Sequence, residues 1–366
     1  MHLKNISIYQ FKNHTSTNLK FEEKINCFTG ENGSGKTNIL DAIHYLSLTK
    51  SYFNYIDTGN IKFNEEYFIL KGDFVKNTNN EAIECSVQIK KGKIIKRNKK
   101  RYKKFSEHIG QFPLIIISPT DTNLIIEGGE ARRKYLNSSI AQYDQSYLYD
   151  LISYNKILKQ RNSLLKKFQD ENSFDPVVLE TYNLQMIKYA EIIYNHRKNF
   201  LKKLVPVFNK YYSEICEQKE NVDIEYKSHL NTENLGILLQ ESIQKDRLSQ
   251  HTTFGVHKDD MIFKMNNYPI KKIGSQGQQK SFLISLKLAQ FEFMHNEINF
   301  KPILLLDDIF DKLDNKRVQQ LINLVKRNKF GQVFITDTNF ERSQSILCDS
   351  EVPFQMFHVK NGEVKI

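Results

Sequence analysis

One segment of the chain has residue types and spacing that fit phosphate binding: Gly30-Glu31-Asn32-Gly33-Ser34-Gly35-Lys36-Thr37, a complete G-x-x-x-x-G-K-[ST] pattern. Its glycines let backbone N–H groups turn toward the phosphates, Lys36 can reach the β- and γ-phosphates, and Thr37 can hold Mg²⁺. The flanks predict a buried strand over Lys24–Thr29 and a helix from Asn38 to about Leu48. Because a helix N-terminus also attracts anions, the segment predicts a site for a nucleoside triphosphate.

Two carboxylates follow a second apolar segment, which is predicted to be a buried strand. Ile303–Leu306 leads directly into Asp307 and Asp308, at the strand end where an open α/β sheet binds its ligands. Asp307 is expected to hold Mg²⁺ beside Thr37, and Asp308 to orient or deprotonate the attacking water. An apolar strand ending in Asp is common, but together with the phosphate-binding loop it predicts hydrolysis of the nucleotide.

A third segment, Gly274-Ser275-Gln276-Gly277-Gln278-Gln279-Lys280, comes immediately before a predicted helix. Small residues at a helix N-terminus present backbone N–H groups, here with a Ser hydroxyl, to an anion. Alone, the segment could be a polar helix cap. Its place between the phosphate-binding loop and the acidic strand favours a second phosphate contact. The candidate contacts are Ser275, Gln276, Gly277 and Gln278.

The elements that carry these motifs divide the chain into three parts. Residues 1–137 are expected to be strand-rich, residues 138–250 helical, and residues 251–366 mixed, ending in an Asn361-Gly362 hairpin signal. Apolar residues recur every three or four positions from Leu179 to Ile193, and Pro206 is expected to interrupt the helical pattern. The simplest architecture is an α/β nucleotide-binding domain built from both ends of the chain, with an α-helical insertion lobe between them.

The basic residues of the chain are concentrated in one run. Ten of them and no acid lie between residues 90 and 104, and they account for most of the net charge of +11. Such a run fits either a nucleic-acid contact or a pair of exposed strands with solvated lysines. The candidate DNA contacts in the run are Lys96, Arg97, Lys100 and Arg101.

Composition limits where the protein is expected to act. The 366 residues contain no apolar run of 18 residues, and the N-terminal residues lack the layout of a signal peptide. The four cysteines (Cys27, Cys85, Cys216 and Cys348) lie far apart with no C-x-x-C pair, which argues against a zinc site or a disulfide framework. The sequence therefore predicts a soluble cytoplasmic protein without membrane association.

The three motifs together resemble those of the ABC-type ATPases, whose signature motif reads Ser-Gly-Gly-Gln where this chain has Ser275–Gln278. The chain departs at Gln276, and Asp311-Lys312-Leu313-Asp314 resembles the segment that follows the acidic strand in that class. The resemblance implies an ATPase head with a mixed sheet and an antiparallel β subdomain, and the cofactors ATP and Mg²⁺. It also implies a homodimer that sandwiches two ATP molecules between the loop of one protomer and the Ser275 segment of the other.

A longer resemblance is to the RecF family of bacterial recombination mediators, which are related to the heads of SMC proteins. The most specific matches are Ser275–Gln279, Tyr154–Asn162 and Gly255–Asp260. The other matching segments are Met1–Asn5, Phe11–Asn13, Gly30–Thr37, Ser118-Pro119, Gly128–Leu136 and Leu304–Asp308.

This family resemblance implies a cytoplasmic, weak DNA-dependent ATPase that dimerises on ATP and binds duplex and gapped or single-stranded DNA. With RecR and RecO, such a protein promotes loading of RecA at single-strand gaps. Slow ATP hydrolysis then acts as a switch, because the γ-phosphate stabilises the dimer over the monomer.

Other classes explain the residues less well. The ATP subunit of a membrane transporter would carry an orthodox signature and a switch His, but Thr336, Asp337 and Thr338 stand at that place. A nuclease-linked ATPase would need a further catalytic domain. An SMC-like head that acts as a structural DNA clamp stays an alternative. Asp308 is one methylene shorter than the Glu common in transporters, which is consistent with weak hydrolysis. The Gln-loop equivalent is expected at the turn after Pro119.

Two further groups of polar residues have several possible roles. Arg132 and Arg133 could contact DNA, a second protomer or an acidic neighbour. His257, Asp259 and Asp260 could hold a metal ion, but no other ligand at suitable spacing accompanies them, which favours a role in loop or interface structure.

Overall fold

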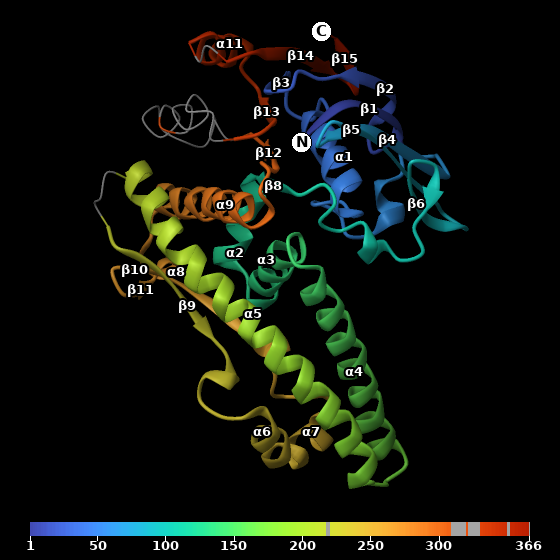
Figure 1. Cartoon of the computed structure of the whole chain (residues 1–366), viewed down its shortest axis with the longest axis vertical. Coiled ribbons are helices and arrows are strands. Elements are labelled where there is room, and N and C mark those ends of the chain that lie inside the picture. The colour runs from blue at the N-terminus through green and yellow to red at the C-terminus, as the bar shows by residue number, and fades with distance from the viewer. Residues whose placement is uncertain (217–219, 309–319, 321–329, 350–351, 366) are drawn as a thin grey trace. The chain divides into compact units, whose positions relative to one another are not determined.

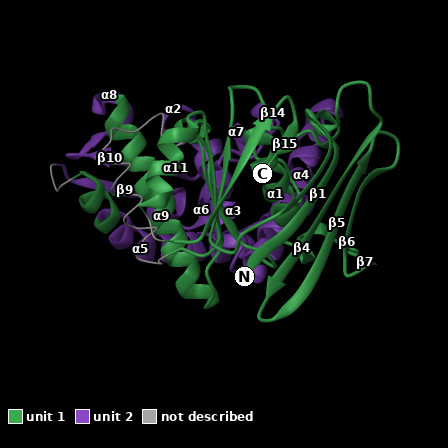
Figure 2. Ribbon diagram, turned by 90° about the horizontal axis from the view of Figure 1, so that it is seen from above, with its two compact units in different colours: residues 1–122, 210–219, 276–366 green, residues 123–209, 220–275 purple. Residues whose placement is uncertain are grey.

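The computed structural model describes residues 1–216, 220–308, 320, 330–349 and 352–365. Their contacts form two compact units, which Figure 2 colours separately. Unit 1 comprises residues 1–122, 210–219 and 276–366, and unit 2 comprises residues 123–209 and 220–275. Unit 1 thus contains both ends of the chain. The boundaries expected at 137/138 and 250/251 both fall inside unit 2.

The first sheet of unit 1 contains both the strand that precedes the phosphate-binding loop and the strand that precedes the two carboxylates, with one strand between them. Its order is β15-β14-β3-β13-β12-β8, and all neighbours except the β14–β15 hairpin are parallel. The strands are β3 (Ile25–Thr29), β8 (Leu114–Ile117), β12 (Ile303–Leu306), β13 (Val333–Asp337), β14 (Phe354–Lys360) and β15 (Glu363–Lys365). Every residue of β3, β8, β12 and β13 is buried, which explains the continuous apolar runs of β8 and β12. The predicted hairpin is confirmed, with Asn361 and Gly362 at φ 50° and 81°.

The second sheet of unit 1 is antiparallel, in the order β2-β1-β4-β5-β6-β7. Its strands are β1 (His2–Phe11), β2 (His14–Lys20), β4 (Tyr67–Lys76), β5 (Asn79–Gln88), β6 (Gly92–Arg97) and β7 (Lys100–Arg101). Burial alternates along β5, where Ile83, Cys85 and Val87 are buried and the residues between them are not. This period of two gives the sheet one apolar face for the core.

Helix α1 (Lys36–Leu48) joins the two sheets of unit 1 into one core. Its apolar residues belong to a single buried cluster with Phe11 and Phe68 of the antiparallel sheet and Phe28 and Phe334 of the parallel sheet. Helix α9 (Gln276–Ile298) is also embedded, because residues on all sides of it are buried between Ser281 and Phe291. Unit 1 further contains α11 (Phe340–Cys348). The sequence also predicts a helix over Lys316–Val325. That segment, apart from residue 320, and the segment Asp311–Asp314 lie outside the described residues.

Unit 2 combines helices with a small sheet. Its helices are α2 (Asn123–Ile126), α3 (Gly129–Ala141), α4 (Gln145–Asp170), the part of α5 (Pro176–Cys216) up to residue 209, α6 (Leu235–Glu241), α7 (Ile243–Ser249) and α8 (Ile270–Ile273). The strands β9 (Val222–Lys227), β10 (Asp260–Met265) and β11 (Tyr268–Pro269) pair in the order β11-β10-β9. The long helices α4 and α5 meet beside α6 and α7 (Figure 1), where Leu165, Phe168 and Leu179 form a small core.

Two sequence expectations about this region were wrong. Residues 222–227 form strand β9 rather than helix, because Val222 and Ile224 alternate with charged residues and pair with β10. Pro206 does not interrupt α5, which runs from Pro176 to Cys216 with the proline inside it. None of the helices in the described part of the chain is long and apolar enough to cross a membrane.

Candidate nucleotide site

The phosphate-binding loop connects β3 to α1 and needs glycine at its two ends. Gly30 and Gly35 have φ values of 150° and 115°, which L side chains rarely adopt. A Cβ at Gly30 would lie 2.1 Å from the carbonyl oxygen of Val359, and one at Gly35 would lie 2.6 Å from the side chain of Asn13. Glycine therefore lets the loop pass close to its neighbours while its N–H groups turn toward a ligand.

Residues from both ends of unit 1 hold the loop in place. The carbonyl oxygen of Ser34 accepts hydrogen bonds from Gly362 N at 2.8 Å and from Asn13 Nδ2 at 3.0 Å. The His14 ring lies between the carbonyl oxygens of Gly35, 3.1 Å from Nε2, and Gly362, 2.9 Å from Nδ1. Burial lowers the pKa of His14, which favours the neutral ring with one donor. The loop is therefore fixed by contacts that its own motif does not contain.

The polar groups of the loop are directed inward. Lys36 Nζ donates to the carbonyl oxygens of Gly30 at 2.7 Å and Glu31 at 2.9 Å, and the lysine is 6% exposed. Ser34 Oγ is buried and has no hydrogen-bond partner among the described residues. An ammonium group held by its own loop and a buried hydroxyl beside it provide the donors that a chain of phosphates requires.

The structure brings Asp307 and the loop together as the sequence predicts. Thr37 Oγ1 donates to Asp307 Oδ1 at 2.7 Å, although the two residues are 270 positions apart. Thr336 Oγ1 donates to the same oxygen at 2.9 Å, and Ser118 Oγ donates to Asp307 Oδ2 at 3.2 Å. Asp307 is 4% exposed, and within the described ranges no Lys, Arg or His lies at ion-pair distance from it. A buried carboxylate surrounded by hydroxyl groups fits a hard divalent cation such as Mg²⁺.

Asp308 follows the strand in an unusual backbone conformation. Its φ is 48°, and its backbone N donates to Thr336 Oγ1 at 2.8 Å, so the carboxylate is half-buried directly after the Asp307 position. Thr336 therefore contacts both acidic residues. The next residue, Asp337, is fully buried and bonds to Arg342 and Ser343. The sequence placed Thr336 and Asp337 where related ATPases carry the switch His, but it did not predict their contacts.

A second polar cluster was missed by sequence reasoning. Asp121, in the turn after Pro119, accepts a hydrogen bond from Ser118 N at 2.8 Å and forms an ion pair with Lys287 Nζ at 2.8 Å. Tyr52 OH also donates to Asp121. Because Lys287 lies on α9 and Ser118 contacts Asp307, the cluster connects the acidic site to the helix that begins at Gln276. No local spacing links these residues, so only the fold reveals the connection.

The segment Ser275–Gln278, called the signature segment below, contains the point where the chain passes from unit 2 to unit 1. Ser275 is the last residue of unit 2, and Gln276 is the first residue of α9. Both side chains are exposed, whereas Gly277 and Gln278 are half-buried, and Ser281 Oγ donates to the carbonyl oxygen of Gly277 at 2.9 Å. The segment is thus at a helix N-terminus, as the sequence predicts.

The four candidate DNA contacts fall on β6 and β7 and differ in their surroundings. Lys96 pairs with Glu84 at 2.7 Å, and Arg97 makes two hydrogen bonds, at 2.9 and 2.6 Å, to Glu81. Arg97 holds the pKa of the Glu81 carboxyl below its ordinary value. The remaining two candidates, Lys100 and Arg101, are exposed. Half of this set is therefore already neutralised by the neighbouring strand.

The conspicuous charged residues near α3 and β10 pair with each other within unit 2. Arg132 makes two hydrogen bonds, at 2.7 and 2.9 Å, to the carboxylate of Asp260, and Arg133 donates to the backbone oxygen of Asp259 at 2.8 Å. The Asp259 carboxylate pairs with buried Arg197 at 2.6 Å. These contacts give Arg132 and Asp260 a structural role.

His257, two residues before Asp259, contacts a different set of residues. Its Nδ1 is 2.7 Å from Tyr154 OH, and its Nε2 is 3.0 Å from the carbonyl oxygen of Thr252. Burial lowers the pKa of His257 to about 4. No cluster of three or more His, Cys, Asp or Glu suited to a metal ion occurs in the described part of the chain.

The parallel strands that carry the loop and Asp307, with an antiparallel sheet packed on α1, define the fold class as an ABC-type ATPase head. The family model described as the RecF/RecN/SMC N terminal domain matches residues 2–365. The chain belongs to this family and, within it, to the RecF proteins.

Its relatives cover nearly its whole length. It is 48% identical over 359 residues to the DNA replication and repair protein RecF of Flavobacterium johnsoniae, covering 98% of this chain and 100% of that protein. It is 44% identical over 366 residues to RecF of Phocaeicola vulgatus, covering 100% and 98% of the two chains.

Solved structures agree with this assignment. A structure of the recombination mediator protein RecF with ATP, described as part of the RecFOR pathway, matches with a TM-score of 0.90 and 33% identity, covering 100% of this chain and 97% of that one. The Smc head domain of Pyrococcus furiosus matches with a TM-score of 0.57 and 15% identity, which shows a shared fold.

Proposed function

We propose that the chain binds and slowly hydrolyses ATP at the loop Gly30–Thr37. The observation that carries this proposal is the 2.7 Å hydrogen bond between Thr37 and Asp307, which joins the phosphate-binding loop to the acidic strand. Lys36 would contact the β- and γ-phosphates, and Asp308 would orient or deprotonate the attacking water. Thr37 and Asp307 would hold Mg²⁺, which neutralises phosphate charge when it is bound.

The active form is proposed to be an ATP-dependent homodimer. The loop of one protomer would bind ATP, and the segment Ser275–Gln278 of the second protomer would contact the γ-phosphate of the same nucleotide. The exposed Ser275 and Gln276 at the start of α9 support this role. ATP would then favour the dimer because it binds both protomers, and hydrolysis would remove that differential affinity.

The biological role follows the RecF relatives, which are named as DNA replication and repair proteins. The chain would act in the cytoplasm and bind duplex and gapped or single-stranded DNA in its ATP-bound form. With RecR and RecO, it would promote RecA loading at single-strand gaps. DNA would stimulate its weak ATPase activity, and the exposed Lys100 and Arg101 would belong to the DNA contact.

The first test is the solution mass, measured by light scattering with and without Mg·ATP. Wild type is expected to double its mass with Mg·ATP, whereas Ser275→Arg stays monomeric and still binds a fluorescent ATP analogue. Ser173→Arg is the matched control, because it places the same side chain in an exposed loop of unit 2 and should dimerise as wild type does. A wild-type mass that never changes would overturn the dimer, and dimerisation of Ser275→Arg would overturn the role of the signature segment.

A further inference from the structure

A groove of about 410 Å³ runs along one side of α4 in unit 2. Its lining residues are Asn155, Leu158, Lys159, Asn162, Ser163, Lys166 and Gln250. The first six recur at spacings of three and four along the helix, so they form one continuous stripe. Gln250 adds a second wall from the segment after α7. Apart from Leu158, all of these side chains are hydrogen-bond donors.

This stripe belongs to a basic stretch that overlaps the family match Tyr154–Asn162 and whose charge sequence reasoning did not single out. Residues 151–168 contain five Lys or Arg residues and no acid. Arg161 is fully buried and forms an ion pair with Asp246 at 2.7 Å. The other four, Lys156, Lys159, Lys166 and Lys167, are exposed. The groove therefore combines two lysines with a positively charged helix face, which favours a polyanion as its occupant.

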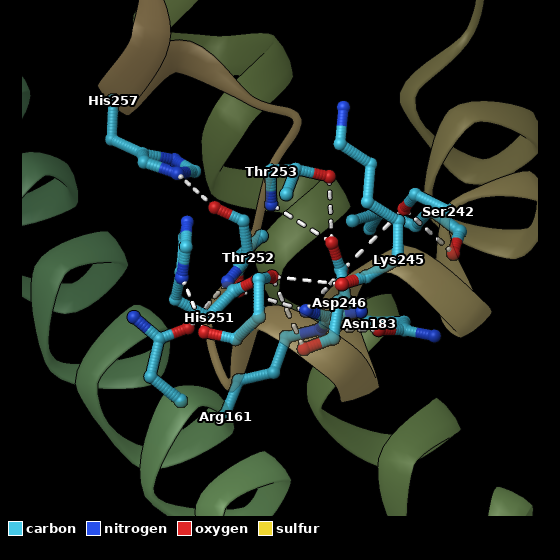
Figure 3. A network of polar contacts seen from close by, with 12 residues as sticks. Arg161, Asn183, Ser242, Lys245, Asp246, His251, Thr252, Thr253 and His257 are labelled. Atoms are coloured by element: carbon cyan, nitrogen blue, oxygen red, sulfur yellow. Dashed lines mark hydrogen bonds and ion pairs between the residues drawn. The ribbon is translucent and has the colours of Figure 1, made fainter.

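A buried network fixes the second wall of the groove against α4. Arg161 Nη1 donates to Asp246 Oδ2 and to Thr252 Oγ1, both at 2.7 Å (Figure 3). Asn162, which lines the groove, accepts hydrogen bonds from Thr252 N at 2.9 Å and Thr252 Oγ1 at 2.7 Å. The segment that contains Gln250 is thus tied to the helix on both sides. The groove is a built feature of unit 2 rather than a gap between mobile side chains.

The lysines are spaced to contact one strand of a nucleic acid. Lys159 and Lys166 are seven residues apart, which is about 10 Å along a helix. Both side chains are long and flexible, so ammonium groups at this spacing can reach two phosphates of one strand. Asn155 and Asn162 repeat the same spacing. Lysine, amide and hydroxyl donors are the groups that proteins use for contacts to phosphates, which carry no sequence information.

We propose that this groove is a second DNA contact, in which Lys159 and Lys166 bind the phosphate backbone of duplex DNA. The inference rests on the proposed DNA binding of the chain and assigns part of it to unit 2, apart from the strands β6 and β7. The contact is independent of sequence and sensitive to salt.

The test is the affinity of the full chain with Mg·ATP for a duplex, measured as a function of salt. K159Q/K166Q is expected to bind about tenfold more weakly, and the slope of log affinity against log salt should become shallower by about 2, because each phosphate contact contributes about 0.9. K156Q/K167Q is the matched control, because it removes the same charge from the same helix outside the groove. It should change affinity less than twofold.

The outcomes separate the groove from general charge effects. Equal weakening by the two double variants, or no weakening by K159Q/K166Q, would overturn the proposal. Selective protection of Lys159 and Lys166 from amine-reactive labelling by duplex DNA would support it. Protection by an acidic polypeptide but not by DNA would overturn it in favour of a protein partner. Absence of any DNA binding by wild type would instead contradict the proposed function.

Discussion

Two buried aspartates, one in each unit, differ in the groups that surround their carboxylates. Asp246 in unit 2 is fully buried and pairs with Arg161 at 2.7 Å, while Thr253 donates twice to its other oxygen. Asp307 in unit 1 is 4% exposed and accepts hydrogen bonds from Thr37, Thr336 and Ser118. Its surroundings in the described structure provide hydroxyl groups but no cation.

From this difference we expect Asp246 to serve stability and Asp307 to serve the proposed chemistry. Removing a carboxylate from water costs several kcal/mol, and a nearby cation repays this only when the geometry is good. Asp246 receives that cation from its own chain. Among the described residues, Asp307 contacts neutral groups alone, so its compensating charge is expected from a bound ligand. On this argument, a carboxylate paired with a cation of its own chain belongs to a structural site, and one that lacks such a cation in the described structure is a candidate ligand site.

The largest effect is expected on removing Asp246. Asp246→Ala would leave Arg161 buried without its partner and should lower the free energy of unfolding of unit 2 by about 3–5 kcal/mol. The measurement is urea denaturation followed by circular dichroism. The double variant R161M/D246L removes both charges and should recover much of the loss, because an apolar pair can replace a buried ion pair. Equal losses in the two variants would show that packing, not charge, dominates at this site.

The matching change in unit 1 should affect chemistry instead. Asp307→Asn is expected to lower phosphate release from ATP about 10²- to 10³-fold, because it removes the charge that we propose holds Mg²⁺. Its free energy of unfolding should change by less than about 1 kcal/mol, since the amide oxygen can still accept from Thr37. Asp73→Asn, at an exposed position of β4, is the control and should leave both quantities unchanged. If Asp307→Asn lost as much stability as Asp246→Ala, Asp307 would also be a structural residue and the proposed difference between the two sites would be wrong.

His108 tests how the burial of a titratable side chain makes stability depend on pH. His108 is fully buried in unit 1, with Nε2 2.7 Å from the carbonyl oxygen of Leu46, and burial lowers its pKa to about 4. The unfolded chain binds this proton near pH 6.5, so stability should fall as pH decreases from about 6.5 to 4, by about 2 kcal/mol at pH 5. His108→Gln should reduce this acid sensitivity, measured from unfolding midpoints. The exposed His358→Gln should not.

The smallest effect is expected at the exposed charges of β6 and β7. K100Q/R101Q should weaken duplex binding about threefold and make its salt dependence shallower. K96Q/R97Q should have less effect on DNA, because Glu84 and Glu81 already pair with these residues. Fluorescence anisotropy over a range of salt concentrations would compare the two variants. A larger loss for K96Q/R97Q would mean that DNA displaces the acidic partners.

The sequence was most informative where chemistry needs a local arrangement of residues. The loop Gly30–Thr37 and the strand end at Asp307 were both recognised, and the general rule that parallel strands bind ligands at one edge predicted their meeting across 270 positions. The hairpin at Asn361-Gly362 was equally clear, because the turn needs positive φ at both residues.

What the sequence did not reveal depends on neighbours that are distant along the chain. Ser118 and Thr336 are ordinary hydroxyl residues until the sheet places them beside Asp307. The ion pair between Asp121 and Lys287 has no spacing signal for the same reason. Strand β9 was missed because a short period-two pattern lies within a long helical region, where the stronger helical signal dominated the interpretation.

The order of strands in the first sheet has a consequence for synthesis of the protein. Strand β3, which leads into the phosphate-binding loop, lies between β13 and β14, and the loop itself is bonded to Gly362. During translation, the loop therefore leaves the ribosome about 300 residues before β13 and β14. Unit 2 takes most of its residues from the middle of the chain and can assemble first. Only a chain translated almost to its end can form a nucleotide site, so prematurely terminated products would lack one.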